Sequence, residues 1–217
     1  MAAKTIEDRL QRVEDFLEIQ NIMGRYAYYI MAGMTREFGE KYFSERPDTR
    51  TYLGEQGYME GPKAFLKVEA QRPAMSEEEK EKSRIGRMAM HCPICPVIEV
   101  AGDGKTAKGV WIGLGLLAMK NRETGEPTGA WEWDKYGVDF IKENGQWKIW
   151  HHHIYRLLHG WNVDEKWAEQ FKKPEPNMGM KMDGPPVDDN PYRPDTIQRM
   201  VPKPPEPYET WEDTFSY

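Results

Sequence analysis

The chain has 217 residues, of which 39% are hydrophobic and 30% are charged, and its formal net charge is −6. This acidic balance excludes the basic surface that nucleic-acid binding requires, and no apolar run reaches the roughly 18 residues of a membrane span. The N-terminal residues contain no apolar signal region, so we expect a cytoplasmic protein made of one domain with an extension.

The N-terminal part of the chain has the pattern of a long amphipathic helix. Thr5 suits the N-cap position, with Asp8 as its capping-box partner. Apolar residues then recur at helical spacing at Ile6, Leu10, Val13, Leu17, Ile19, Ile22, Met23, Tyr26, Ala27 and Ile30. The pattern predicts one long helix, or two joined helices, ending near Gly33.

Shorter elements follow in the next part of the chain. Residues 35–43 and 63–71 predict helices, and residues 51–53 predict a short strand within a loop region. The charged run over residues 76–82 predicts a solvated helix or loop.

The second half of the chain predicts a sheet. Residues 87–100, 106–120, 129–142 and 147–158 have the composition of strands and are separated by turn signals. Short connections between consecutive strands favour antiparallel pairing, and helices followed by strands indicate an α+β fold. Residues 163–172 predict a short terminal helix.

The composition changes again in residues 173–217, which hold ten of the 16 prolines. Aromatic residues are scattered through this segment, whereas a disordered tail would be poorer in them. We therefore expect an extended Pro-rich C-terminal arm that packs along its own subunit or along a neighbour.

The last predicted strand carries three of the five histidines. Strand alternation would place Lys148, Trp150, His152, Ile154 and Arg156 on one face and Trp147, Ile149, His151, His153 and Tyr155 on the other, unless a bulge shifts the register. An imidazole and a guanidinium among apolar groups suit a pocket better than a plain core. We expect the imidazoles of His151 and His153 on the outer face of the sheet or in a subunit interface.

Cys92 and Cys95 form a C-x-x-C pair, which could be a redox pair or half of a zinc site completed by histidines such as His91. A redox pair usually precedes a helix, whereas residues 96–100 predict a strand. We therefore expect buried unpaired thiols and no metal.

The sequence contains no P-loop, dinucleotide fingerprint, serine nucleophile elbow or H-E-x-x-H motif. Their absence excludes the common enzymes that such motifs signal. It favours acid–base chemistry without a cofactor.

Three segments together carry a family resemblance: the helical run over residues 9–26, the strand that begins Met90-His91, and the strand from Gly145-Gln146-Trp147 to Arg156. Over residues 5–160 the chain resembles the SnoaL-like proteins of the nuclear transport factor 2 (NTF2)-like superfamily. Within it, the chain is similar to the bile acid 7α-dehydratases and, more distantly, to the scytalone dehydratases. The resemblance implies a cystatin-like cone over residues 1–172, with helices packed on a curved antiparallel sheet and residues 173–217 as a separate arm. It also implies a homo-oligomer, a trimer or a dimer.

These relatives are cofactor-free lyases, and the resemblance implies roles for three residues. Tyr26 matches the helix tyrosine of the dehydratases, His91 their strand histidine and Arg156 their arginine. Gly109 and Trp111 match a Gly-x-Trp of the intervening strand.

The chain also departs from the dehydratase pattern, because two acidic residues are missing. Met31 stands where one acid is expected, and Gly115 or an apolar neighbour stands where the other is. A histidine base usually needs a carboxylate partner to orient it. His152 or Asp134 are the residues that we expect to compensate.

The favoured function is therefore a lyase of the dehydratase type, with His91 as base, Tyr26 and Arg156 as oxyanion stabilisers and His152 as a further catalytic candidate. The ligand-binding residues that we expect share an aromatic or adaptable side chain: Tyr29, Met31, Trp111, Trp131, Trp133 and Trp150. Such walls suit an aromatic, steroid-like or polyketide-like small molecule. The alternatives are an isomerase or aldehyde-releasing lyase acting on a lignin-derived aromatic, a non-catalytic binding protein, and a metal site built on the cysteines.

Overall fold

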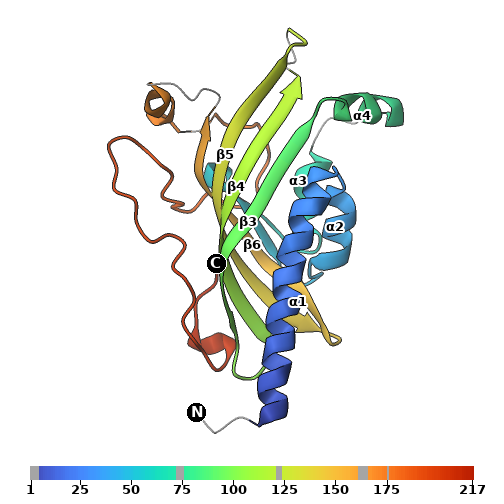
Figure 1. Cartoon of the computed structure of the whole chain (residues 1–217), viewed down its shortest axis with the longest axis vertical. Coiled ribbons are helices and arrows are strands. Elements are labelled where there is room, and N and C mark those ends of the chain that lie inside the picture. The colour runs from blue at the N-terminus through green and yellow to red at the C-terminus, as the bar shows by residue number, and fades with distance from the viewer. Residues whose placement is uncertain (1–4, 72–75, 121–123, 161–165, 175) are drawn as a thin grey trace.

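The structure is a computed structural model that describes residues 5–71, 76–120, 124–160, 166–174 and 176–217. Helices cover one face of a curved sheet, and the C-terminal arm crosses the opposite face (Figure 1). We call these the inner and the outer face of the sheet. The α+β class and the helices-on-sheet architecture expected from the sequence are confirmed.

Helix α1 (Ile6–Met31) is the single long helix that the periodicity allowed. It begins with a capping box, in which the Thr5 N–H donates to the Asp8 carboxylate at 3.0 Å and the Asp8 N–H donates to the Thr5 hydroxyl at 3.1 Å. Its buried side packs on β3 and the core through Asp15, Ile19, Ile22, Met23 and Tyr26.

Three shorter helices follow, and all lie where the sequence predicts a helix or a solvated segment. They are α2 (Thr35–Tyr42), α3 (Ala64–Ala70) and α4 (Glu77–Arg84). Phe38 of α2 and Phe65 of α3 are buried beside Phe43, and their rings form an aromatic cluster over the inner face of the sheet. The charged run is α4, capped by Ser76.

The sheet has six strands in the order β2-β1-β6-β5-β4-β3. The four long strands are β3 (Met88–Val100), β4 (Thr106–Lys120), β5 (Pro127–Glu143) and β6 (Gln146–Gly160), and each lies where the sequence predicts it. The short strand β1 (Arg50–Leu53) pairs in parallel with β6, so the sheet is not wholly antiparallel. Strand β2 (Tyr58–Glu60) was not predicted, because three residues are too few for a periodic pattern.

A bulge in β6 corrects the face assignment made from simple alternation. Asp139 of β5 pairs with His151, whereas the next residue, Phe140, pairs with Ile149, so Trp150 is the extra residue. Past the bulge the alternation reverses. As a result Trp147 and Ile149 share the inner face with His152, Ile154 and Arg156.

The start of β6 is tied to α1 by a buried carboxylate. Asp15 is 3% exposed and accepts from the indole Nε1 of Trp147 at 2.9 Å and from Nζ of Lys142 at 2.6 Å. A buried carboxylate needs such partners, and here they fix the long helix across the sheet.

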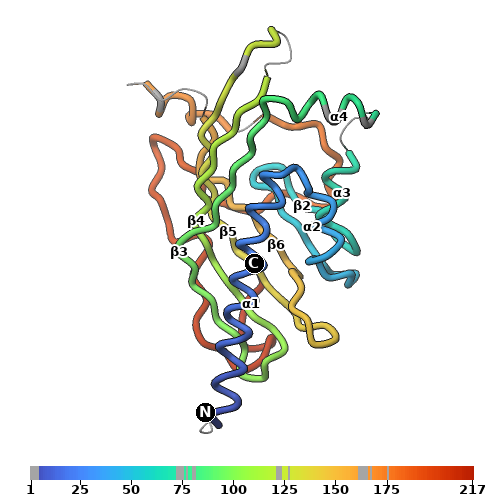
Figure 2. Tube along the Cα trace, turned by 45° about the vertical axis from the view of Figure 1, so that its right-hand side comes forward, coloured from blue at the N-terminus to red at the C-terminus, as the bar shows by residue number. Residues whose placement is uncertain are grey.

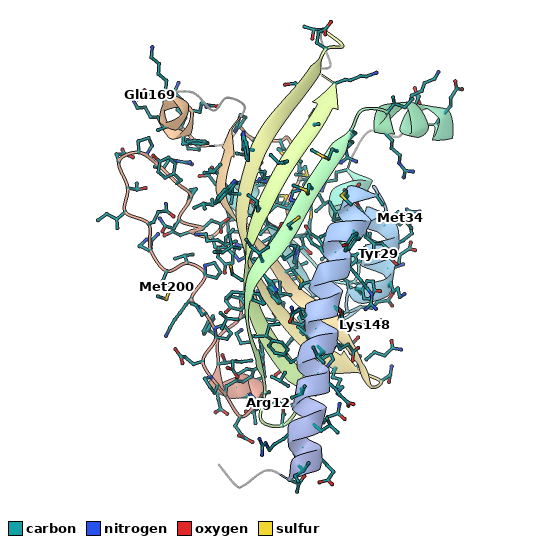
Figure 3. All side chains as sticks on the ribbon, viewed as in Figure 1. Arg12, Tyr29, Met34, Lys148, Glu169 and Met200 are labelled. Carbon is teal, nitrogen blue, oxygen red and sulfur yellow. The ribbon has the colours of Figure 1, made fainter. Side chains whose placement is uncertain are left out.

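The arm follows the outer face of the sheet and reaches the turn between β3 and β4 (Figure 2), where the Gly102 N–H donates to the Tyr208 carbonyl oxygen at 2.9 Å. It contains the short 3-10 helix η3 (Trp211–Asp213), while η2 (Trp167–Phe171) precedes it. Helix η2 is the short terminal element that we expected, although residues 163–165 of the prediction lie outside the described residues.

The end of the arm is held by one buried carboxylate on β5. Asp139 accepts from Lys108 Nζ at 2.5 Å, from Ser216 Oγ at 3.0 Å and from the Tyr217 N–H at 2.9 Å, and it also contacts His151 Nδ1 at 2.8 Å. The arm therefore packs along its own subunit. None of the described helices is long and apolar enough to cross a membrane.

Candidate functional site

The central feature of the candidate site is a row of residues across the inner face of the sheet. His91 of β3 pairs with Gly115 of β4, which in turn pairs with Glu132 of β5. Gly115 has no side chain, so the two flanking side chains meet above it, with His91 Nε2 3.6 Å from Glu132 Oε2. A Cβ at position 115 would lie only 2.6 Å from the Glu132 carbonyl oxygen.

Arg156 of β6 completes this cluster. Its Nη1 contacts the Glu132 carboxylate directly and lies 3.4 Å from Asp134 Oδ1. The two carboxylates are almost fully buried, at 6% and 2% exposure of their side chains. Two buried acids around one guanidinium hold it in a fixed orientation, because a buried charge must be paired.

Tyr26 of α1 faces the cluster from the helical side. Its ring lies 5.7 Å from that of Tyr136 and 5.4 Å from that of His152, between centroids. Burial, assisted by the charge of Asp134, raises the pKa of Tyr26, while Arg156 opposes the shift. Tyr26 is therefore a protonated phenol and a hydrogen-bond donor at neutral pH.

The imidazoles of the site are neutral. Burial, with the positive charge of Arg156, lowers the pKa of His91 to about 4 and that of His159 to about 4. Burial also lowers the pKa of His152 to about 3. Both ring nitrogens of His152 lack a hydrogen-bond partner among the described residues, so His152 contacts its neighbours through ring packing alone.

A hollow of about 340 Å³ lies beside the cluster, where β6 continues past the end of β1. Arg156 and His159 line it together with Leu157, Phe171, Pro176 and Arg193. Its far wall comes from the arm, where Arg193 Nη2 lies 2.6 Å from Glu55 Oε1 and holds the arm against the 3-10 helix η1 (Gly54–Gln56). A ligand in this hollow would lie next to the charged row.

His91, Glu132 and Asp134 are also the one trio of described residues whose donor atoms lie close enough to hold a metal, within 4.8 Å of one another. Arg156 already lies against both carboxylates and supplies the positive charge that a metal ion would supply. The two cysteines are not part of the trio: Cys92 is half-buried and Cys95 is exposed, so the expectation of buried thiols is wrong for Cys95.

The other histidines of the triplet lie on the outer face, as expected. His153 Nε2 is 2.8 Å from Asp189 Oδ1 of the arm, and His151 lies between Asp139 and Ser216. His151, Asp139 and Ser216 do not form a catalytic triad. Asp139 and Ser216 both contact Nδ1 of the His151 ring, whereas in a triad the acid and the nucleophile contact opposite ring nitrogens.

The ligand-binding residues expected from the sequence are dispersed. Tyr29 packs on Phe38 and Tyr42, and Trp111 is buried over Phe140. Met31 ends α1 with 48% exposure. The three remaining tryptophans lie on the outer face: Trp131 and Trp133 are partly exposed, and Trp150 stacks on His151 because of the bulge.

Two residues of the cluster, Glu132 and His159, were missed by the sequence interpretation. The useful signal was present, since Glu132 and Asp134 are the only acids spaced by two residues within a strand otherwise rich in tryptophan. Glu132 of the neighbouring strand pairs with Gly115, so a carboxylate does lie beside the position at which the resemblance led us to expect an acid.

Helices packed on a curved open sheet, with a polar cluster between them, define a small α+β domain of the kind that the sequence resemblance implied. The chain belongs to the SnoaL-like domain family, whose sequence pattern matches residues 11–153. The family expected from the sequence is therefore confirmed. Proteins with curated descriptions gave no match.

Solved structures with the same fold are distant in sequence. A protein assigned as a scytalone dehydratase from Novosphingobium aromaticivorans is 16% identical, with a TM-score of 0.52, and the match covers 79% of this chain and 97% of that one. A type 2 hexachlorocyclohexane dehydrochlorinase is 13% identical, with a TM-score of 0.53 and coverage of 71% and 93%. A protein from Kribbella flavida is 12% identical, with a TM-score of 0.51 and coverage of 67% and 93%. These likenesses concern the fold.

Proposed function

We propose that the protein is a cofactor-independent lyase that eliminates water, or another small leaving group, from a hydrophobic small molecule with an aromatic, steroid-like or polyketide-like body. The observation that carries this proposal is the contact between His91 and Glu132 across Gly115, with Arg156 against the same carboxylate. It joins a base, its carboxylate partner and a cation in one row.

His91 has the properties of the base in this reaction. With a pKa lowered to about 4, chiefly by burial, it is unprotonated at neutral pH and is able to accept a proton from a carbon next to a carbonyl or a conjugated phenol. The Glu132 carboxylate, 3.6 Å away, would then stabilise the imidazolium that forms.

Tyr26 and Arg156 would stabilise the negative charge that develops. Tyr26 keeps its proton and can donate to the departing oxygen or to an oxyanion, while the guanidinium carries five N–H donors in a fixed plane. His152 packs on the ring of Tyr26 and would position it. The names of the dehydratase and dehydrochlorinase that share this fold agree with an elimination.

The hollow supports the placement of the substrate body. Its volume of about 340 Å³ is at the lower end of the range for small-molecule sites, and Arg156 and His159 connect it to the row. Its lining combines leucine, phenylalanine and proline side chains with charged ones such as Lys173 and Arg193, which would suit an apolar body that carries polar substituents.

The test is turnover of β-hydroxy ketones and of phenylpropanoid alcohols, followed by the ultraviolet absorbance of the new conjugated double bond and by an assay for released formaldehyde. We expect His91→Ala to lower turnover by about 10²- to 10⁴-fold. Tyr26→Phe should lower it as well, while Tyr28→Phe, whose side chain is exposed on the same helix, is the matched control.

Full turnover in the His91→Ala variant would show that the assigned base is wrong. Binding of these compounds without any turnover by the native chain would favour the alternative, a protein that binds its ligand and does not transform it.

A further inference from the structure

Helix α1 is apolar on two opposite sides. One side is buried against β3 and the core, through residues such as Ile19 and Met23. On the other side Ile6, Leu10, Val13 and Leu17 are 78%, 58%, 55% and 53% exposed. At about 100° per residue the two sets lie on opposite sides of the helix axis. A helix that packs on its own domain alone needs only the first set.

The exposed side chains continue as a heptad pattern along the helix. From Ile6 the spacing alternates between four and three residues, and it is kept to the end of α1 through Gln20, Gly24, Ala27 and Met31. We call this set of residues the outer stripe. Apart from the polar Gln20, its members are apolar residues or glycine, and apolar residues at such spacing form the seam of helix pairs.

Small residues in the second half of the outer stripe leave room for another helix. A Cβ at Gly24 would have no atom within 4 Å, so this part of the stripe faces open space. The first turns of α1 extend past the end of the sheet (Figure 1). A partner helix could therefore lie along the stripe without meeting the sheet.

We propose that the outer stripe is the dimerisation surface of this protein, and that its occupant is the same stripe of a second copy. Exposed apolar side chains that form one continuous row mark an interaction site rather than a solvated face. A two-fold axis brings identical stripes together, and each apolar position then meets an apolar position.

The charges beside the stripe favour a parallel arrangement of the two helices. Arg9 lies on one flank, and Glu7 and Glu14 lie on the other. In a parallel pair opposite flanks meet, so Arg9 of each copy faces Glu14 of the other, at the spacing used by salt bridges between paired helices. An antiparallel pair would bring the acidic flank against itself.

The first test is the mass of the full chain in solution, measured by light scattering and sedimentation over a range of protein concentrations. We expect a dimer of the 25.4 kDa chain. Leu10→Glu combined with Val13→Glu should give a monomer, and this monomer should fold because both side chains are already exposed in the single chain. Glu37→Lys on α2 is the control and should leave the dimer intact. A native chain that stays monomeric, or a double variant that stays dimeric, overturns the proposal.

The second test examines the orientation. Arg9→Glu should weaken the dimer about tenfold or more, and Arg9→Glu with Glu14→Arg should restore it, since like charges face each other in the first variant only. Leu17→Cys, in a chain with Cys92→Ser and Cys95→Ser, should form a disulfide between the two copies. Failure of both the rescue and the cross-link, in a chain that is dimeric, would exclude the parallel pairing.

Discussion

At the residue scale, Gly115 holds the candidate site together by having no side chain. A Cβ there would meet two carbonyl oxygens, at 2.6 Å on Glu132 and 3.0 Å on Met90, and neither backbone can yield easily. We predict that Gly115→Ala lowers the free energy of unfolding by about 1–3 kcal/mol and separates His91 from Glu132. Urea denaturation measures the first effect, and an NMR titration of His91 measures the second.

Gly24→Ala in α1 is the matched control, because an added Cβ meets nothing within 4 Å in the single chain, and both glycine changes are compared in the Leu10→Glu, Val13→Glu background, where the proposed dimer surface does not contribute. This change should stabilise the protein by about 1 kcal/mol, since alanine is the better helix former. Equal stability of the two variants would mean that position 115 has more room than its neighbours indicate.

The second prediction at this scale compares two adjacent imidazoles with different surroundings. His152 has no hydrogen-bond partner among the described residues, whereas His153 bonds to Asp189 at 2.8 Å. His152→Phe should keep the free energy of unfolding or raise it by about 1 kcal/mol, because the new ring packs among the same aromatic side chains without burying polar nitrogens that have no partner. His153→Phe should cost about 1–3 kcal/mol, because it leaves a buried carboxylate oxygen unpaired. Loss of stability in both variants would reveal a partner of His152.

At the element scale, the arm depends on one carboxylate. Asp139 is fully buried and accepts hydrogen bonds from Lys108, Ser216 and the Tyr217 N–H. Asp139→Asn leaves the buried ammonium of Lys108 without its counter-charge, so we predict a loss of about 3–5 kcal/mol. Limited proteolysis should then cleave the released arm. Asp195→Asn, at an exposed position of the same arm, is the control, and equal resistance of both variants would contradict this role of Asp139.

The elements themselves could be predicted where the chain carries a local pattern. The capping residue Thr5, the helical periodicity of α1 and the turn at Asn144-Gly145 are local signals, and the structure confirms each. The bulge at Trp150 could not be predicted, because it is defined by the pairing of β6 with β5 and not by β6 alone.

The candidate site was predictable only in part for the same physical reason. His91 and Arg156 both lie against Glu132, and Tyr26 lies close enough to Asp134 and Arg156 for their charges to act on its pKa. The partner of His91 was missed because it comes from two strands away, across a glycine. Trp131 and Trp133 do not line the inner face as expected for a ligand pocket, because strand alternation places both on the outer face.

At the scale of the whole molecule, three buried neutral imidazoles make the fold sensitive to acid. The pKa values of His91 and His159 are lowered to about 4 and that of His152 to about 3, against an ordinary value of about 6.5. Between pH 6.5 and pH 4 the unfolded chain therefore binds more protons than the folded chain. The free energy of unfolding has its full value above pH 6.5 and falls as the pH is lowered towards 4.

We predict that the free energy of unfolding drops by about 2 kcal/mol for each of these imidazoles between pH 7 and pH 5. Carboxylates are still mostly ionised in this range, so urea denaturation at several pH values there reports the imidazoles. His152→Phe removes one of them and should make the decline shallower by about a third, whereas Asp195→Asn should leave its slope unchanged. A decline that begins only below pH 5 would assign the acid sensitivity to carboxylates and would mean that these histidines keep their ordinary pKa in the folded protein.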